Sequence, residues 1–230
     1  MNNLSKDCLG IIANYLPFKD AFNISLLNKD CNKIWPYIKY EHVVKCQDLN
    51  IIRKHKNIKF SYKSSKLFDI PDNLHTLDLS YTRISDISGF NVKNLHTLHL
   101  FGTRISDISG FDVKNLHTLH LFGTQISDIS GFDVKNLRAL DLSWTHISNI
   151  SGFDHKNLHT LSLSGTQISD ISGFDVKNLH TIYLSNTRIS DILGFNVKNL
   201  RALDLSWTQI SNISGFDVKN LHTLYLSRTR

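Results

Sequence analysis

Residues 73–93 read Asn-Leu-His-Thr-Leu-Asp-Leu-Ser-Tyr-Thr-Arg-Ile-Ser-Asp-Ile-Ser-Gly-Phe-Asn-Val-Lys, and this stretch decides the fold because it returns every 21 residues. Seven units are complete, and the eighth reaches Arg230 after its strand segment. Self-similarity at a fixed period of this length indicates a solenoid in which each unit forms one rung. The asparagine that opens the unit marks the register and recurs at Asn94, Asn115, Asn136, Asn157, Asn178, Asn199 and Asn220.

Within one rung the spacing of apolar residues changes. Leu77-Asp78-Leu79 alternates, which places two leucines on one face of a short strand. The next apolar residues follow at three-residue spacing, as in a tight helical or turn segment. Burying one apolar side chain contributes about 1.5–3 kcal/mol, whereas ordering the backbone costs roughly 1–2 kcal/mol per residue. A lone rung is therefore unstable, and stacking must cover its six predicted inward residues. These are Leu74, Leu77, Leu79, Ile84, Ile87 and Phe90.

The pattern Leu74-x-x-Leu77-x-Leu79-x-x-Thr82-x-Ile84 resembles the leucine-rich-repeat signature, with threonine where that family more often has asparagine. The resemblance covers residues 73–230. It implies an α/β solenoid with parallel strands on the concave face. In that family the asparagine side chain makes hydrogen bonds to backbone groups inside the turn, and the asparagines of successive rungs form a ladder along the stack. We expect the threonine hydroxyls to take this role more weakly, without changing the fold.

Differences among the copies concentrate at predicted strand positions that point away from the core. In a leucine-rich solenoid, such positions line the concave side and bind partners. Aromatic and arginine side chains often anchor interfaces. Recent duplication is the alternative, since the units at 94–114 and 115–135 differ only at Arg104 and Gln125. Both explanations stay open for any single residue. The predicted target-binding residues are Tyr81, Arg83, Arg104, Trp144, Tyr183, Arg188, Trp207 and Tyr225.

Catalytic and metal-binding patterns are not evident in the sequence. Asp78, Asp141 and Asp204 lie three rungs apart, too far for paired acid–base work. A histidine follows the first leucine in most rungs, and a copied surface position explains it more simply than metal chelation does. Neither a phosphate-binding loop, nor a nucleophile elbow, nor a zinc-spaced Cys/His set is present. We therefore expect a protein that is not an enzyme and has no cofactor, metal or small-molecule substrate.

Charge and cysteine usage exclude further classes. Residues 1–72 contain 12 Lys/Arg and 7 Asp/Glu, whereas the repeats contain 14 and 13, so the extended surface is nearly neutral and nucleic acid is not the expected partner. The apolar runs are too short to span a membrane, and no secretory signal is recognised. Three irregularly spaced cysteines do not form a disulfide framework. These features favour a cytoplasmic protein that does not bind membranes.

Helical spacing replaces the repeat in residues 1–45, where Leu9, Ile12 and Leu16 share a face. This segment resembles an F-box, whose pattern is matched by Leu4, Leu9, Ile11-Ile12, Tyr15-Leu16, Asp20, Leu26-Leu27, Asn28-Lys29 and Trp35. Ser5 stands where the family has proline. The resemblance implies a small all-α unit that binds a Skp-family adaptor and, through it, a cullin. Its implied adaptor-binding residues are Leu4, Leu9, Ile12, Tyr15, Leu16, Leu27 and Trp35.

Three regions follow: the F-box-like helices at 1–45, a basic connector at 46–72 with a cap strand near Ile58–Phe60, and the solenoid at 73–230. The favoured function is a non-catalytic substrate receptor of a cullin-type ubiquitin ligase. The alternative is a protein-binding module unrelated to ubiquitin, whose first helices only cap the solenoid. A third hypothesis is an adhesive protein of the internalin type. Near-identical repeats in an Asn-, Ile- and Lys-rich chain are similar to F-box and repeat families of giant viruses and amoeboid protists, which implies a host cytoplasm.

Overall fold

The computed structural model describes most of the repeat region and isolated parts of the chain before it. Before the repeats these are Val44, Lys45, Gln47, Asn50, Arg53 and residues 60–64. From there they are 70–111, 113–132, 134–151, 153, 155–172, 174, 176–195, 197–213 and 219–230. The predicted adaptor-binding residues all lie outside this set: Leu4, Leu9, Ile12, Tyr15, Leu16, Leu27 and Trp35.

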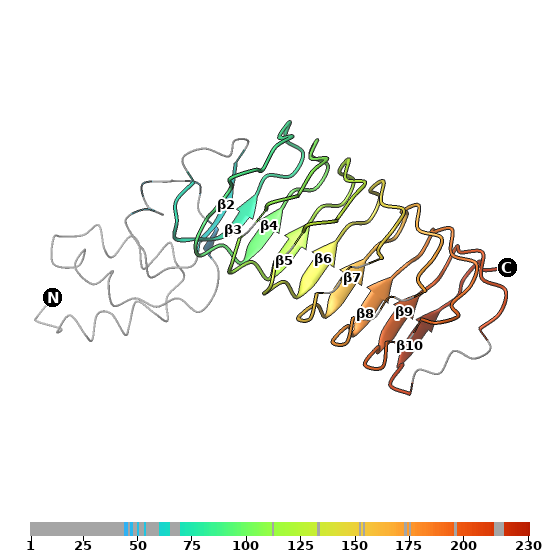
Figure 1. The fold of residues 1–230 in the computed structure, drawn as a ribbon. Coiled ribbons are helices and arrows are strands. Elements are labelled where there is room, and N and C mark those ends of the chain that lie inside the picture. Colours follow the sequence, from blue (N-terminus) through green and yellow to red (C-terminus); the bar gives the residue numbers. More distant parts are fainter. Residues whose placement is uncertain are drawn as a thin grey trace, which may run out of the picture. The chain divides into compact units, whose positions relative to one another are not determined.

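The described residues form ten strands (Figure 1). β1 (Val44–Lys45) pairs in parallel with β2 (Phe60–Lys63), so a strand begins at Phe60, the last residue of the predicted cap strand. β3 spans Leu74–Asp78. The remaining strands are β4 (Thr97–His99), β5 (Thr118–His120), β6 (Ala139–Asp141), β7 (Thr160–Ser162), β8 (Thr181–Tyr183), β9 (Ala202–Asp204) and β10 (Thr223–Tyr225).

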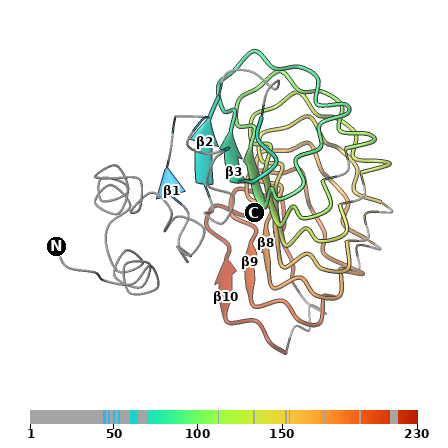
Figure 2. The same cartoon turned by 90° about the vertical axis from the view of Figure 1, so that its left-hand side faces the viewer.

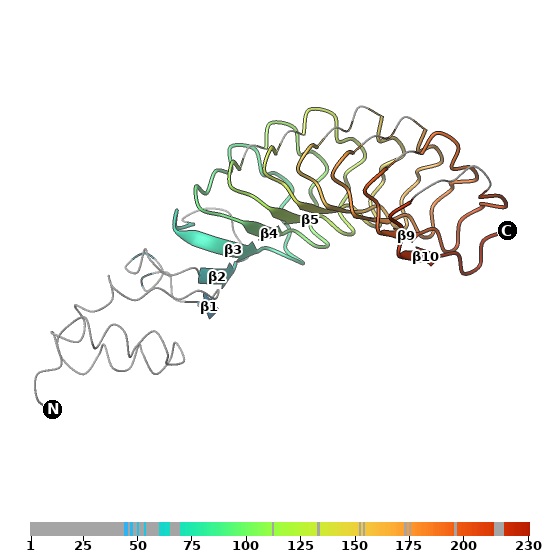
Figure 3. The same ribbon diagram turned by 90° about the horizontal axis from the view of Figure 1, so that it is seen from below.

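The chain divides into two compact units, and the larger one contains residues 78–91 and 96–230. In this unit each strand from β4 to β10 pairs in parallel with the next. Leu98 opposes Leu119, and Leu119 opposes Leu140, so equivalent residues of successive rungs are in register. Figure 2 shows the strands on one side of the coil and the loops on the other. Figure 3 shows the strands of this unit along the inner side of an arc, which is the predicted concave arrangement.

The core consists of the inward positions that the repeat predicts. In the rung at 94–114 all six equivalents are buried, namely Leu95, Leu98, Leu100, Ile105, Ile108 and Phe111. In the first rung Ile84 and Phe90 are only half-buried. A seventh buried position, held by Val113 and Val134, was not predicted, and His155 occupies it in the next rung. The His155 ring lies between apolar neighbours, and its Nε2 is 3.1 Å from the Phe132 carbonyl oxygen.

The loop side of the repeats differs from the α/β expectation. Its described residues form turns closed by short-range bonds, such as the one from Phe111 N–H to the Ile108 carbonyl at 3.3 Å. Backbone bonds also join the rungs beyond the strands, for example from Gln125 N–H to the Ile105 carbonyl at 2.9 Å. The described repeats therefore form a parallel-strand β-solenoid. A 21-residue rung leaves little length for a helix once the strand and its turns are made.

The ladder that we expected from threonine is made by another residue. The Thr124 hydroxyl donates to the Leu121 carbonyl at 2.7 Å, three residues earlier, and so closes the turn of its own rung. The equivalent threonines do the same. The bond between rungs comes instead from the asparagine that opens each unit. Asn157 Nδ2 donates to the Lys135 carbonyl at 2.8 Å, and Asn178 Nδ2 donates to the Lys156 carbonyl at 2.6 Å.

Candidate protein-binding surface

The residue between the two strand leucines lies on the concave face. Ile182 and Leu184 on either side of Tyr183 are buried, whereas Tyr183 itself is 39% exposed. In the last rung Tyr225 is 53% exposed. Both tyrosines were predicted to bind a target, and both lie on this strand face. Successive rungs therefore present one variable side chain each, about 4.8 Å apart. Along the stack these are Asp78, His99, His120, Asp141, Ser162, Tyr183, Asp204 and Tyr225.

The predicted aromatic residues Tyr81, Trp144 and Trp207 lie at the turn after the strand, where every rung has a left-handed backbone. Their φ angles are 59°, 58° and 60°. Glycine adopts this conformation without strain and holds the position at Gly102 and at two further rungs. A bulky side chain there costs on the order of 1–3 kcal/mol. Bulky aromatic residues in this conformation point to a function at the surface that offsets the strain.

The three rings are exposed yet rest on the following rung. Tyr81 is 76% exposed and Trp144 is 55% exposed. A methyl group placed on Gly165 would lie 2.6 Å from Cδ2 of Trp144, so this ring packs directly on the glycine backbone. The guanidinium carbon of Arg228 lies 4.2 Å from the Trp207 ring centre, in a cation–π contact. Each ring is thus fixed on one side and remains open to a partner on the rest of its surface.

Carboxylates accompany these aromatic residues in the same rungs. Asp141 Oδ1 accepts a hydrogen bond from Ser143 N–H at 3.0 Å, and Asp204 Oδ1 accepts one from Ser206 N–H at 2.9 Å. Burial raises the pKa of the Asp141 carboxyl, but the nearby His120 imidazole and the bonds from Ser143 outweigh it, so this pKa lies below its usual value. Asp141 is therefore a fixed carboxylate at neutral pH, with its Oδ2 3.9 Å from His120 Nδ1.

The histidines of the concave face form a stacked pair. The rings of His99 and His120 are 4.8 Å apart and nearly parallel. Burial lowers the pKa of His99, the positive field of His120 lowers it further, and Asp78 opposes both effects only in part. The His99 imidazole is consequently neutral at pH 7. The strand face therefore carries carboxylates and the neutral His99 ring in this region.

Two aromatic residues of this surface were not singled out from the sequence. Phe101 and Phe122 are half-buried, and their rings stack 4.3 Å apart. The ring centres of Tyr81 and Phe101 are 5.3 Å apart in an edge-to-face arrangement. The sequence does mark these two phenylalanines, because each of the remaining six rungs has serine at the same position. Those serines are Ser80, Ser143, Ser164, Ser185, Ser206 and Ser227.

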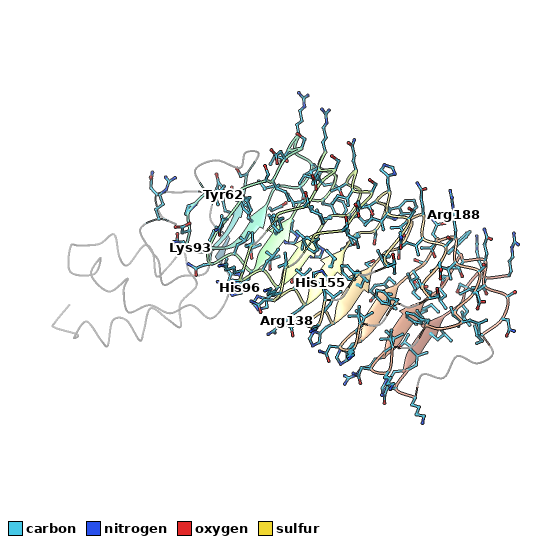
Figure 4. The ribbon with its side chains drawn as sticks, in the orientation of Figure 1. Tyr62, Lys93, His96, Arg138, His155 and Arg188 are labelled. Carbon is cyan, nitrogen blue, oxygen red and sulfur yellow. The ribbon has the colours of Figure 1, made fainter. Side chains whose placement is uncertain are left out.

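The predicted arginines Arg83, Arg104 and Arg188 are exposed and follow the threonine that closes the turn. Figure 4 shows Arg188 at one edge of the solenoid and Arg138 at the opposite edge, where the strands begin. The arginines therefore adjoin the aromatic turn and do not lie on the strand face. The predicted target-binding set divides into two strand tyrosines, three turn aromatics and three loop arginines.

The edge where the strands begin carries imidazoles as well. The rings of His96 and His117 stack at 5.0 Å, and those of His159 and His180 stack at 5.1 Å. Among the described residues, no cluster of three or more His, Cys, Asp or Glu side chains is placed to hold a metal ion. Within the same part of the chain, no helix has the length and apolar character needed to cross a membrane.

Comparison with known proteins agrees with this architecture. A family model described as Leucine Rich repeats (2 copies) matches residues 72–113 and 156–196, and one described as Leucine Rich repeat matches 135–152 and 198–215. Together these ranges cover 119 of 230 residues. No curated protein matches the chain significantly.

Solved structures share the fold at low sequence identity. The internalin InlF of Listeria monocytogenes is 18% identical with a TM-score of 0.67, over 98% of this chain and 75% of the internalin. Internalin C2 of the same organism is 23% identical with a TM-score of 0.55, over 68% and 82% of the two chains. TLR13 in complex with ssRNA13 is 19% identical with a TM-score of 0.58, over 97% of this chain and 37% of that chain.

Proposed function

We propose that this chain, which belongs to the leucine-rich-repeat proteins, is a non-catalytic recognition protein whose concave strand face and adjoining turns bind a target protein. The observation that carries the proposal is the set of exposed aromatic rings at left-handed turn positions. Supported rings of this kind lose little conformational entropy on binding and are frequent anchors of interfaces.

Duplication of the unit accounts for the near identity of the rungs but not for this choice of residue. At the turn position, glycine is the residue that costs least, and Gly102, Gly123 and Gly165 show that the fold accepts it. Retaining Trp144 in the same strained conformation makes sense where the indole contributes to binding. The alternative of a surface without a role predicts that removing the ring leaves every interaction of the protein unchanged.

The ligase assignment is a finer proposal and rests on sequence. The F-box resemblance of residues 1–45 and its position directly before leucine-rich repeats support an adaptor-binding role for that segment. In this proposal the protein performs no chemistry. It holds a target near a ubiquitin-charged enzyme and so raises the local concentration of the target's lysines. A Skp-family adaptor and a cullin would place the protein in a eukaryotic cytoplasm, that of the host for a viral chain.

Affinity capture from a eukaryotic lysate tests both parts with the full-length chain. Leu9→Asp with Ile12→Asp is expected to abolish capture of the Skp-family adaptor and cullin while the target is still recovered. Trp144→Ala with Trp207→Ala is expected to abolish target capture while the adaptor is still recovered. Gln167→Ala with Gln209→Ala changes exposed residues just beyond the turns and serves as the matched control.

The result decides between the two functions. Adaptor recovery that survives the Leu9 and Ile12 substitutions would contradict the proposal that residues 1–45 bind the adaptor. No adaptor recovery with the unmodified chain would favour a protein-binding module unrelated to ubiquitin, with residues 1–45 as a cap. Target recovery that survives loss of both indoles would contradict the proposed binding surface itself.

A further inference from the structure

Four successive rungs between Asp78 and Trp144 form a patch with a regular composition, named here the four-rung patch. Its two outer rungs each carry a carboxylate on the strand and a large aromatic residue at the turn. Its two inner rungs each carry histidine, phenylalanine and glycine at the equivalent places. The patch consists of Asp78, Ser80 and Tyr81, then His99, Phe101 and Gly102, then His120, Phe122 and Gly123, then Asp141, Ser143 and Trp144.

The centre of the patch is an aromatic floor two rungs wide. Phe101 stacks on Phe122, and two residues earlier in the same rungs the His99 ring stacks on that of His120. Both phenylalanines remain half-exposed. A methyl group placed on Gly123 would meet no atom within 4 Å, so the floor is open above this glycine. Such a surface accepts an apolar side chain.

The ends of the patch have the chemistry of a cation site. At Asp141 and Trp144, an ionised carboxylate and an exposed indole occur in one rung, and together they favour a guanidinium or ammonium group. The molecule contains an internal example of this preference. Three rungs further along, the guanidinium of Arg228 already lies over the indole of Trp207.

The spacing of the two ends selects the shape of the ligand. Three strand intervals of about 4.8 Å separate the outer rungs by about 14 Å, which matches four residues of extended peptide at about 3.4 Å each. We propose that the four-rung patch binds an extended segment of the target protein that has cationic side chains four residues apart and an apolar side chain midway between them. This inference rests on the proposed protein-binding function and adds the chemistry of the target to it.

The two ends are not equivalent, which adds a ranking to the proposal. Arg83 and Arg104 follow the turns at the Tyr81 end and repel a cation there. The corresponding residues at the Trp144 end are Gln125 and His146. Asp141 therefore contributes more to binding than Asp78.

The experiment measures fluorescence anisotropy of labelled peptides with the full-length protein. The probe Thr-Arg-Ser-Leu-Ser-Arg-Thr has arginines four residues apart, and matched probes have them two or six residues apart. We expect the four-residue spacing to bind about fivefold more tightly than either matched probe. Asp141→Asn should weaken it about tenfold and Asp78→Asn about threefold. Asp204→Asn is the control and should change nothing, since the adjoining Trp207 already holds Arg228.

Several results would overturn the proposal. These are equal affinity at all spacings, tighter binding when glutamate replaces arginine, an equal loss with Asp204→Asn, or preferential binding of a linear neutral oligosaccharide. Capture of a target from lysate that is lost with Trp144→Ala plus Trp207→Ala but kept with Asp141→Asn would leave the proposed function intact and remove only this inference. Target capture unchanged in both variants would remove the proposed function.

Discussion

The side chains at the start of each strand hardly vary along the solenoid, whereas those at the end of each strand change from rung to rung. At the start, a Lys-Asn pair recurs, and the asparagine amide donates to the carbonyl of the lysine in the preceding Lys-Asn pair, as Asn199 does to Lys177 at 2.7 Å. At the end, one left-handed position holds tyrosine, glycine, tryptophan, asparagine or arginine. Because register is held at one edge, the other edge can vary without disturbing the stack.

The largest expected effect tests whether the starting edge really holds the register. Replacing Asn136, Asn157 and Asn178 with alanine removes three bonds between rungs, each contributing about 0.5–1.5 kcal/mol. The midpoint of urea denaturation should fall clearly. The matched control replaces Gln125, Gln167 and Gln209 with alanine beside the other edge, where exposed substitutions typically change stability by less than about 0.5 kcal/mol. Equal losses in both variants would remove the distinction between the edges.

A second comparison concerns two glycines at the variable edge. Gly165→Ala and Gly123→Ala each place a side chain at positive φ, with values of 70° and 64°, and each should cost about 1 kcal/mol. Gly165→Ala should cost about 1 kcal/mol more because its methyl group meets the Trp144 ring. Thermal unfolding measures the difference, and a changed tryptophan emission would report the displaced indole. Identical melting temperatures would show that the ring is free to move aside.

A third, smaller effect depends on pH. Burial is the first cause that lowers the pKa of both His99 and His117, and a neighbouring imidazole lowers each further. The unfolded chain therefore binds protons near pH 6.5 that the folded chain still rejects, so stability should decline as pH falls below about 6.5. The decline in stability should end once the pH has fallen below the pKa values that His99 and His117 have in the folded chain.

Melting temperatures at pH 7.5 and 5.5 check this dependence. The double variant His99→Gln with His117→Gln should lose less stability between these two conditions than the unmodified protein does. His146→Gln changes an exposed histidine and is the control. An unaltered pH response in the double variant would show that other groups cause it.

The smallest expected change in stability accompanies Trp144→Gly. Loss of the ring contacts is offset by relief of backbone strain, so the free energy of unfolding should change by less than about 1 kcal/mol. Trp144→Ala keeps the strain and should be the less stable of the two. Target capture should be lost in both. A glycine variant that is much less stable than the unmodified protein would indicate that the indole is a structural residue.

The rung itself was predictable from sequence because its determinants are local. The 21-residue period, the leucine alternation and the inward set ending at Phe90 all follow from one unit. The asparagine ladder was not predictable in this way. It depends on a hydrogen bond from Asn157 to a carbonyl 22 residues earlier, and only the stacking of the rungs brings these two groups together. The left-handed turn did leave a signal, since Gly102, Gly123, Gly165 and Asn186 share one position, and glycine and asparagine favour positive φ.

The candidate site was predictable only in part for a related reason. Tyr183 and Trp144 stand out because large aromatic residues are conspicuous among small ones. Only the backbone geometry shows that Tyr183 lies on the strand face and Trp144 at the turn. Phe101 and Phe122 gain their meaning from stacking with one another and from the serines that replace them elsewhere. The adaptor-binding residues remain a prediction from resemblance.

The asparagine ladder also bears on how such a chain changes length. Each amide reaches a carbonyl 22 residues earlier, that of the lysine directly before the asparagine that opens the preceding unit. Inserting or deleting a whole 21-residue unit therefore recreates every bond at the junction, whereas a fragment of any other length breaks them. Unequal exchange between repeated gene segments can then alter the copy number while the protein still folds, and each new copy supplies one more turn residue that can diverge.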